Sequence, residues 1–164
     1  MERELWGLAE LNESLFCDLD DPRVLNQHDA ERLWCRVGAF PTQCREGYRL
    51  AGRIGRRAGS SCPPRTVVIF GLGGSAAAGD LLVRTLEEGF TVPVFAWRGY
   101  RLPKWVNQDT ICLVVSYSGN TQEAVDAFHE SRCRGARTIV VSSGGDLTRL
   151  ALAHHCPLIL NPRG

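Results

Sequence analysis

Apolar and polar positions follow two different periods along the chain, helical in its first third and strand-like afterwards. In the first third, apolar side chains recur every three or four positions, which predicts helices over 5–16, 22–37 and 41–54. Asp21 followed by Pro22 is typical of a helix start, with Asp21 as the N-cap residue. The pattern therefore predicts a helical leader, and it carries no recognisable chemistry.

After this leader, short runs rich in β-branched residues alternate with helix-like stretches. Strands are predicted at 66–70, 92–96, 110–115, 137–141 and 157–160, and helices at 76–86, 121–132 and 146–155. Pro93 lacks a backbone donor, which favours a sheet edge for the second strand. Continuous apolar strands joined by helices are typical of parallel sheets that are covered on both faces.

The predicted fold class is therefore α/β, a doubly wound five-stranded parallel sheet flanked by helices. Residues 66–164 are expected to form this domain, and residues 1–65 an N-terminal helical segment that packs on its core. In such sheets, ligands bind beyond the carboxyl ends of the strands, at the point where the strand order reverses. The loops that follow the strands are therefore the expected place of function.

Composition narrows the classes of function. The chain has 164 residues, which suits one compact domain. Lys and Arg total 19 against 18 Asp and Glu, so no net charge attracts nucleic acid or an anionic membrane. No apolar stretch approaches the ~20 residues that span a bilayer, and the charged residues 2–4 are unlike a signal peptide. We expect a cytoplasmic protein that has neither nucleic-acid nor membrane partners.

The seven cysteines are widely separated, and no two of them form a C-x-x-C pair. Structural zinc sites use closely spaced pairs of ligands, so we expect no metal site and no cofactor. An odd number of cysteines without an export signal favours free thiols in a reducing compartment. Cys112 lies inside an apolar run and is expected to pack as a small hydrophobic residue.

Two loops at strand-to-helix junctions carry candidate chemistry. Residues 71–76 are glycine-rich, so their backbone can approach an anion at the N-terminus of the following helix. Residues 116–121 add the hydroxyls of Ser116, Ser118 and Thr121 beside another helix N-terminus. Hydrogen bonds and helix dipoles can neutralise a phosphate there, although Lys104 is the single lysine of the chain.

Each loop has a second interpretation. Residues 71–76 also fit the loose G-x-G-x-x-G/A pattern of dinucleotide-binding folds, in which an acidic residue ends the second strand. Trp97 and Arg98 stand there instead, and an arginine is suited to a 2′-phosphate. The hydroxyls of the second loop could serve only as helix N-caps, although three in six residues exceed what one cap needs. Both alternatives stay open at this point.

Four motifs together resemble the sugar isomerase (SIS) domain, whose fold is a sandwich of the predicted type. They are Gly73-Gly74-Ser75 with Gly79-Asp80-Leu81-Leu82, then Arg98-Gly99-Tyr100-Arg101-Leu102-Pro103, then Ser116-Tyr117-Ser118-Gly119-Asn120-Thr121, and Ser143-Gly144-Gly145. Phe40-Pro41-x-Gln43 also matches, so that the resemblance covers residues 37–164. Within the SIS family, the chain most specifically resembles the amino-terminal half of bifunctional phosphoglucose/phosphomannose isomerases. The combination of the two loop motifs is specific, whereas neither is specific alone.

The resemblance implies a hexose 6-phosphate ligand. Members of that family interconvert glucose 6-phosphate or mannose 6-phosphate with fructose 6-phosphate, by ring opening and proton transfer between C1 and C2 through an enediol. The resemblance also implies that the two loops bind the phosphate, through Gly74, Ser75, Ser116, Ser118, Gly119, Asn120 and Thr121. Family members pair their SIS domains, so this chain is expected to form a homodimer through SIS–SIS packing.

The family's catalytic Glu, His and Lys come from a second SIS domain, so the catalytic residues stay unassigned here. We expect this chain to hold the phosphate-binding half of an isomerase, with Pro162-Arg163-Gly164 resembling a turn that precedes the family's active-site arginine. Local candidates are explained better as caps, packing or surface residues: Asp80, Lys104, Glu123, His129, His154 and His155. The alternatives are a non-catalytic sugar-phosphate-binding module and a nucleotide-binding α/β domain.

Overall fold

The apolar runs of the second half of the chain form one parallel sheet in the computed structural model. The structure describes residues 21, 23, 29, 32–55 and 63–161. By its internal contacts the chain divides into two compact units, residues 1–46 and residues 47–164. The domain boundary that the sequence places between residues 65 and 66 stays a prediction, as does packing of the leader on the core.

Two described helices precede the sheet in the sequence. α3 (Leu33–Gly38) begins where the Asp29 carboxylate accepts hydrogen bonds from the N–H groups of Leu33, at 2.6 Å, and Trp34, at 2.8 Å. α4 (Phe40–Gly55) confirms the helix predicted over 41–54. The helix predicted over 5–16 lies outside the described residues. None of the helices that the structure describes is long and apolar enough to cross a membrane.

The sheet has five parallel strands, as the sequence predicts, and the structure gives their order as β2-β1-β3-β4-β5. Its strands are β1 (Thr66–Phe70), β2 (Val94–Trp97), β3 (Thr110–Ser116), β4 (Arg137–Ser142) and β5 (Leu158–Leu160). β2 is an edge strand, which confirms the interpretation of Pro93. The Pro93 carbonyl still accepts a hydrogen bond from Val67 N–H at 2.9 Å, where β2 meets β1.

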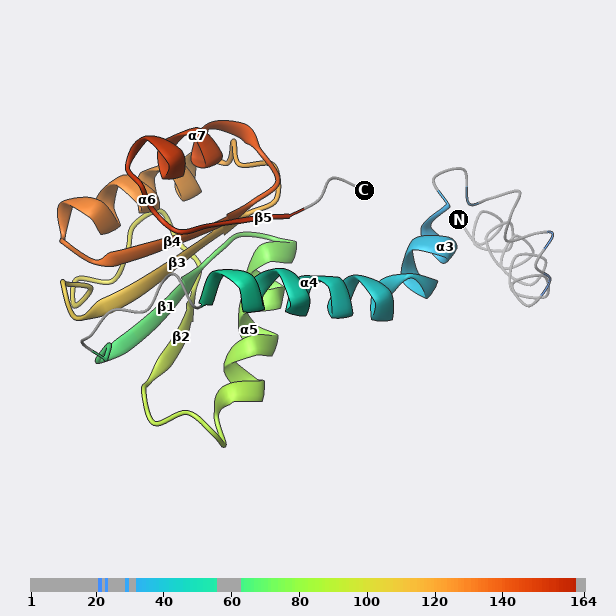
Figure 1. Cartoon of the computed structure of the whole chain (residues 1–164), viewed down its shortest axis with the longest axis horizontal. Coiled ribbons are helices and arrows are strands. Elements are labelled where there is room, and N and C mark those ends of the chain that lie inside the picture. Colours follow the sequence, from blue (N-terminus) through green and yellow to red (C-terminus); the bar gives the residue numbers. More distant parts are fainter. Residues whose placement is uncertain (1–20, 22, 24–28, 30–31, 56–62, 162–164) are drawn as a thin grey trace, which may run out of the picture. The chain divides into compact units, whose positions relative to one another are not determined.

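Three helices of the described chain cover this sheet: α5 (Gly74–Leu86), α6 (Gln122–Cys133) and α7 (Gly145–Ala153). α6 contacts β3 and β4, α7 contacts β4 and β5, and the two helices lie side by side (Figure 1). α5 packs mainly on β1 and β2. Crossovers in parallel sheets are right-handed, and the chain moves in opposite directions from β1 and from β3. The two groups of helices therefore cover opposite faces.

Successive side chains along each strand point alternately to these two faces of the sheet. Val68 and Phe70 are fully buried in the core that includes Phe128 of α6. Ile69 points to the other face, where α5 approaches so closely that a Cβ on Gly79 would lie 3.2 Å from Ile69 Cγ2. Glycine at position 79 therefore lets α5 lie flat on β1.

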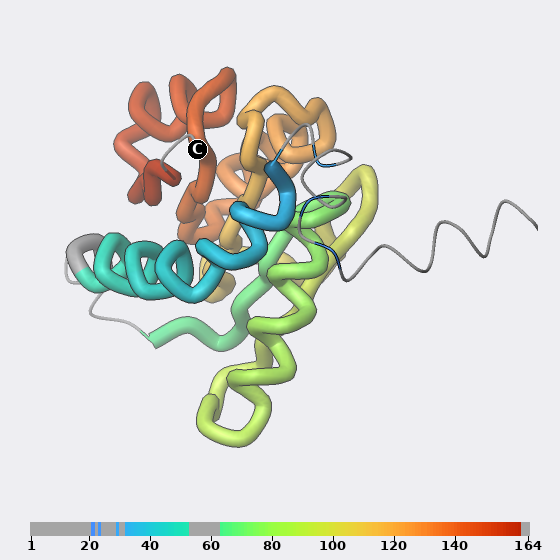
Figure 2. The backbone as a smooth tube through the Cα atoms, turned by 90° about the vertical axis from the view of Figure 1, so that its right-hand side faces the viewer, coloured from blue at the N-terminus to red at the C-terminus, as the bar shows by residue number. Residues whose placement is uncertain are grey.

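The connection from β2 to β3 differs from the others because residues 98–109 form a loop without a helix (Figure 2). This loop carries the chain past β1 and buries Leu102 and Val106 in the core beside α6. Glu130 of α6 fixes it by accepting a hydrogen bond from Leu102 N–H at 2.7 Å. Because the loop passes β1, strands β1 and β3 are neighbours in the sheet. The helices that follow them, α5 after β1 and α6 after β3, lead away from each other toward β2 and β4.

Candidate functional site

The two candidate loops meet at the carboxyl edge of the sheet. β1 and β3 are neighbours, but the chain leaves β1 through α5 toward β2 and leaves β3 through α6 toward β4. Connections that diverge in this way leave a crevice between the two strand ends, where open α/β sheets bind their ligands. The topology therefore brings residues 71–76 and 116–121 to the same place.

A cavity of about 550 Å³ opens at this crevice. Its lining comes from the ends of four strands and the first turns of α5 and α6: Leu72, Gly74, Ser75, Ala78, Val115, Ser116, Tyr117, Ser118, Thr121, Ala124, Val141, Ser142 and Asn161. Small-molecule sites commonly have volumes of about 300–1,000 Å³. The cavity is thus large enough for a ligand of the size of a phosphorylated sugar.

The glycines after β1 permit the tight turn that begins α5. A Cβ on Gly71 would lie 2.9 Å from the carbonyl carbon of Ser75, and Gly73 has a φ of +55° that favours glycine. The turn is closed by a hydrogen bond from Ser75 N–H to the Leu72 carbonyl at 3.1 Å. Ser75 consequently stands in the first turn of α5, where it is one of the residues that line the cavity.

The hydroxyl-rich loop after β3 is held by its own hydrogen bonds. Ser116, which is 4% exposed, accepts a hydrogen bond from Gly119 N–H at 3.2 Å, and its Oγ lies 3.0 Å from Thr121 Oγ1. The hydroxyl of Ser118 accepts a weaker bond from Asn120 N–H at 3.3 Å. Ser116 therefore acts inside the loop, whereas Ser118 stands on its exposed side.

This hydroxyl loop also interlocks with the loop between β4 and α7. Leu147 N–H donates to the Gly119 carbonyl at 2.9 Å, and Asp146 N–H donates to Asn120 Oδ1 at 3.1 Å. The two backbones approach so closely that a Cβ on Gly119 would lie 1.8 Å from the Gly144 carbonyl oxygen. The side chain of Asn120 thus caps α7 from the neighbouring loop.

Two helix N-termini supply positive potential at the cavity. α5 and α6 both begin at its wall, and neither has a side-chain hydrogen bond at its N-cap residue. Each such terminus carries roughly half a positive charge and unpaired N–H groups. Within the described chain, no Asp, Glu, His, Lys or Arg lines the cavity. This arrangement is suited to binding an anion by hydrogen bonds.

The SIS domain family model matches residues 62–162 of the chain. The chain belongs to the SIS domain family. A curated relative, the bifunctional phosphoglucose/phosphomannose isomerase of Caldicellulosiruptor bescii, is 34% identical over 125 residues, which are 76% of this chain and 37% of that protein. The protein of the same name from Aquifex aeolicus is 34% identical over 103 residues, 62% of this chain and 32% of that one. This SIS chain therefore spans about a third of the length of these relatives.

Solved structures agree with the SIS fold. The Vibrio vulnificus NanR protein, solved in complex with ManNAc-6P, superposes with a TM-score of 0.55 at 17% identity. The superposition covers 84% of this chain and 54% of that chain. At this level of identity the likeness concerns the fold, and it confirms the predicted sandwich.

The cavity at the ends of β1 and β3 brings together most of the residues that the sequence predicts to bind the phosphate. Those that line it are Gly74, Ser75, Ser116, Ser118 and Thr121, whereas Gly119 and Asn120 contact the β4–α7 loop instead. The sequence interpretation missed Tyr117, Ser142 and Asn161 as lining residues. Tyr117 could have been found, because it lies inside the 116–121 motif. No sequence signal marks Asn161, because only the order of the strands places the end of β5 at the same edge of the sheet as the two loops.

The acidic and histidine residues near the SIS loops lie outside the cavity lining. Glu123 is in the first turn of α6, where a carboxylate stabilises the helix N-terminus. The rings of His129 and His154 both lie against Phe128, with centroids 5.7 Å apart in each pair. His155 follows α7 with a φ of +52°. The ring contacts of His129 and His154 and the position of Glu123 in the helix agree with the structural roles that the sequence predicts for these three residues.

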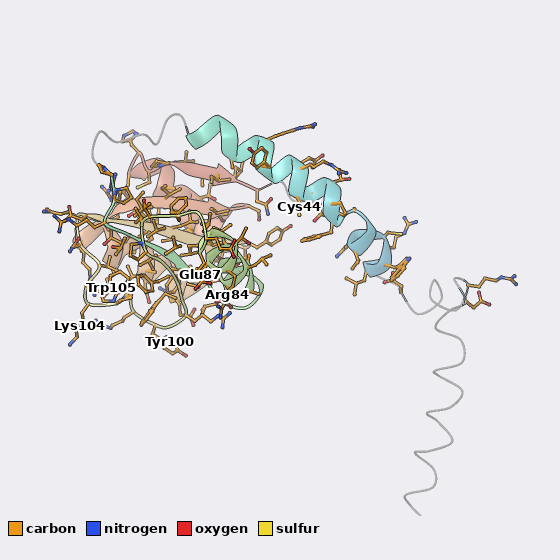
Figure 3. All side chains as sticks on the ribbon, turned by 90° about the horizontal axis from the view of Figure 1, so that it is seen from below. Cys44, Arg84, Glu87, Tyr100, Lys104 and Trp105 are labelled. Atoms are coloured by element: carbon orange, nitrogen blue, oxygen red, sulfur yellow. The ribbon has the colours of Figure 1, made fainter. Side chains whose placement is uncertain are left out.

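The cationic residues that follow β2 also lie outside the cavity lining. Arg98 forms an ion pair with Asp80 of α5. The guanidinium that could bind the 2′-phosphate of a dinucleotide is therefore already paired with a carboxylate. Lys104 is exposed on the loop between β2 and β3 and points away from the domain (Figure 3). Neither residue lines the cavity.

The cysteines within the described chain are all free: Cys35, Cys44, Cys112, Cys133 and Cys156. Burial raises the pKa of the Cys112 thiol to about 12, which agrees with its predicted packing as a small hydrophobic residue. Cys17 and Cys62 lie outside the described residues. No group of three potential metal ligands comes together in the part of the chain that the structure describes.

Proposed function

We propose that this chain is the phosphosugar-binding SIS domain of an aldose–ketose isomerase that interconverts glucose 6-phosphate or mannose 6-phosphate with fructose 6-phosphate. The observation that carries the proposal is a hydroxyl-lined cavity at two helix N-termini, in which none of the lining residues that the structure describes is charged. Such a site binds a phosphate ester through N–H and O–H donors. The names of the relatives that are 34% identical support the choice of substrate.

In this proposal the hydroxyls of Ser75, Ser118 and Thr121 donate hydrogen bonds to the phosphate oxygens. Ser116 holds Thr121 and the backbone of the loop in place. The proposed binding set is Gly74, Ser75, Ser116, Ser118, Gly119, Asn120 and Thr121, in which Gly119 and Asn120 hold the shape of the loop by donating their N–H groups to Ser116 and Ser118. Charge-assisted hydrogen bonds to a phosphate contribute about 1.5–3 kcal/mol each.

The isomerisation needs groups beyond the phosphate site. Proton transfer between C1 and C2 requires a carboxylate base, and the developing oxyanion of the enediol requires a donor or cation. We propose that a second SIS domain, outside this chain, supplies these groups, as the family resemblance implies. The role of this domain is then to hold the phosphate so that the C1–C2 end of the sugar meets that catalytic set.

The proposal includes a homodimer formed through SIS–SIS packing. It also includes a cytoplasmic location, because free thiols such as those described here persist in a reducing compartment. The small-molecule partner in this proposal is the hexose 6-phosphate.

A second candidate function is a sugar-phosphate-binding module that has no turnover. It is favoured by the cavity lining, in which Tyr117 is the only titratable side chain of the described residues. It is also favoured by the ligand of NanR, since a protein of the same fold was solved with a phosphorylated amino sugar. Measurable isomerisation by the 164-residue chain, abolished in Ser118→Ala, would exclude this alternative.

The test is a thermal-shift titration of the chain with fructose 6-phosphate. A ligand that binds only the folded state stabilises it by about 2.7 kcal/mol at one hundred times Kd, which raises Tm by roughly 5–10 °C. Free fructose should give no shift, because it lacks the phosphate. Ser118→Ala removes a proposed donor and should raise the Kd by about 10- to 100-fold.

The matched control is Thr91→Ala, which deletes an exposed hydroxyl before β2, outside the cavity lining. This variant should bind fructose 6-phosphate as the wild type does. NADP is titrated in parallel, because a shift with NADP and none with fructose 6-phosphate would favour the nucleotide-binding alternative. No shift with fructose 6-phosphate at millimolar concentration contradicts the proposed phosphate site.

A further inference from the structure

We propose that Tyr117 and Asn161 form the part of the cavity that recognises the sugar, separate from the hydroxyls that hold the phosphate. The inference rests on the proposed function, since it takes the phosphate to be bound at the loops after β1 and β3. It names two residues that line the same cavity but that the proposed phosphate site does not require. Their task is to distinguish a phosphorylated sugar from phosphate itself.

The order of the strands separates Asn161 from the loops proposed to bind the phosphate, whereas Tyr117 lies between Ser116 and Ser118 at the end of β3. Ser75 follows β1 and Ser118 follows β3, which are neighbours, whereas Asn161 follows β5, two strands beyond β3. Neighbouring strands lie about 4.8 Å apart, so Asn161 stands roughly 10 Å from the end of β3 along the edge of the sheet. A phosphate held at the first two loops does not reach it. An open-chain hexose attached to that phosphate extends in this direction.

The backbone of Asn161 is fixed at the edge of the cavity. Its N–H donates to the carbonyl of Ser142 at 2.8 Å, and Ser142 is itself 1% exposed. The hydroxyl of Ser142 donates to the Gly144 carbonyl at 2.8 Å, so that hydroxyl is occupied within its own loop. The carboxamide of Asn161 makes no hydrogen bond to any residue of the described chain. It offers one acceptor and two donors, which suit the hydroxyls of a sugar.

Tyr117 is fixed in the same way from the β4–α7 loop. Its carbonyl accepts a hydrogen bond from Ser143 N–H at 3.0 Å and a second one from the Ser143 hydroxyl. Tyr117 is 55% exposed and lines the cavity. An aromatic ring presents an apolar face to the C–H groups of a sugar, and its phenol is an additional hydrogen-bonding group. Ser142, the last residue of β4, thus holds the backbone of Asn161, and Ser143 of the β4–α7 loop holds the backbone of Tyr117.

The experiment compares two ligands, fructose 6-phosphate and inorganic phosphate, by calorimetric titration of the full 164-residue chain. Asn161→Ala should weaken binding of fructose 6-phosphate by about three- to tenfold and leave binding of phosphate within twofold. Tyr117→Ala should do the same, while Tyr117→Phe keeps the ring and should retain most of the affinity. Ser118→Ala, by contrast, should weaken both ligands alike.

Both substituted positions are exposed, so the variants are expected to fold, and their Tm without ligand checks this. Thr91→Ala again serves as the neutral control. The inference is wrong if Asn161→Ala and Tyr117→Ala leave the ratio of the two affinities unchanged, or weaken phosphate as much as fructose 6-phosphate. If the wild-type chain binds fructose 6-phosphate and Ser118→Ala has no effect, the proposed phosphate site fails instead. Binding of neither ligand by the wild type overturns both.

Discussion

At the scale of single residues, two glycines determine where the hydroxyls of the cavity stand. Gly119 has a φ of +71° and Gly145 a φ of +72°, a region that side chains rarely adopt. Each of them also touches the opposing loop, since a Cβ on Gly145 would lie 2.5 Å from the Ser118 carbonyl oxygen. The position of Ser118 therefore depends on close contact between two loops, although neither glycine lines the cavity.

Gly119→Ala tests this dependence. The new Cβ would lie 1.8 Å from the Gly144 carbonyl oxygen and 2.6 Å from Ser142 Oγ, so the loops must separate. Together with the unfavourable φ, this should lower the free energy of unfolding by at least about 2 kcal/mol. Urea denaturation measures the loss, and titration with fructose 6-phosphate should show weaker binding in the folded fraction.

The matched control is Gly47→Ala in the interior of α4, where a Cβ meets nothing within 4 Å. Alanine favours a helix over glycine, so this variant should be stabilised by about 0.5–1 kcal/mol. Opposite signs for the two glycine-to-alanine changes are the expected result. A Gly119→Ala variant as stable as the wild type would show that the loops can part without cost.

Cys112 gives a second prediction at this scale. Burial raises the pKa of its thiol to about 12, so at pH 8 on the order of one thiol in ten thousand is ionised. Iodoacetamide at pH 8 should therefore label the exposed Cys35, Cys44 and Cys133 in the native protein and leave Cys112 unmodified until guanidinium is added. Mass spectrometry of the digested protein measures this, and labelling of Cys112 at the rate of Cys133 contradicts it.

The same pKa has a consequence for stability. The thiol of the unfolded chain ionises near pH 9, whereas the buried thiol stays protonated to about pH 12. The unfolded state therefore binds fewer protons between these values, and the contribution of Cys112 to stability is complete below pH 9 and declines as the pH rises toward 12.

At the scale of elements, periodicity was enough to find the strands and helices of the described domain, and local chemistry decided their ends. β1 has the bounds that its β-branched run predicts. α5 begins at Gly74 and not at Ala76, because Gly73 adopts a positive φ and serves as its N-cap residue. β2 begins at Val94 and not at Val92, because its pairing with β1 starts where Val94 meets Val67.

The site was predictable only as far as single elements define it. Ser75 and Ser118 could be assigned from the loops that contain them, because a strand-to-helix junction places them at a helix N-terminus. Two features could not be assigned from the sequence: the place of Asn161 at the cavity, and the hydrogen bond from Asp146 N–H to Asn120 Oδ1. The first depends on which strands are neighbours, and the second on how closely two loops approach. Their hydrogen bonds join residues from separate elements, and no local pattern encodes such a partner.

At the scale of the whole domain, aromatic side chains that are incompletely buried lie on the edge strand β2 and in the segments just before and after it. Each is exposed by a third or more of its surface: Phe90, Phe95, Trp97, Tyr100 and Trp105. Phe95 and Trp105 form a tilted pair with ring centroids 5.1 Å apart, and Tyr100 and Trp105 are seen on the loop beside the strand (Figure 3). Contiguous apolar surface at a sheet edge is unfavourable in water and is commonly covered by a partner.

The proposed homodimer makes a prediction for this scale. A closed pair of identical chains buries the same apolar surface on each copy, and two-fold symmetry is the commonest way to do so. Light scattering at tens of micromolar should therefore give twice the chain mass of 18.1 kDa, and dilution should lower the apparent mass as the pair dissociates. High salt should leave the pair intact, because apolar contacts are not screened. A monomeric mass at that concentration would show that the exposed aromatic surface of one SIS domain is tolerated without self-association.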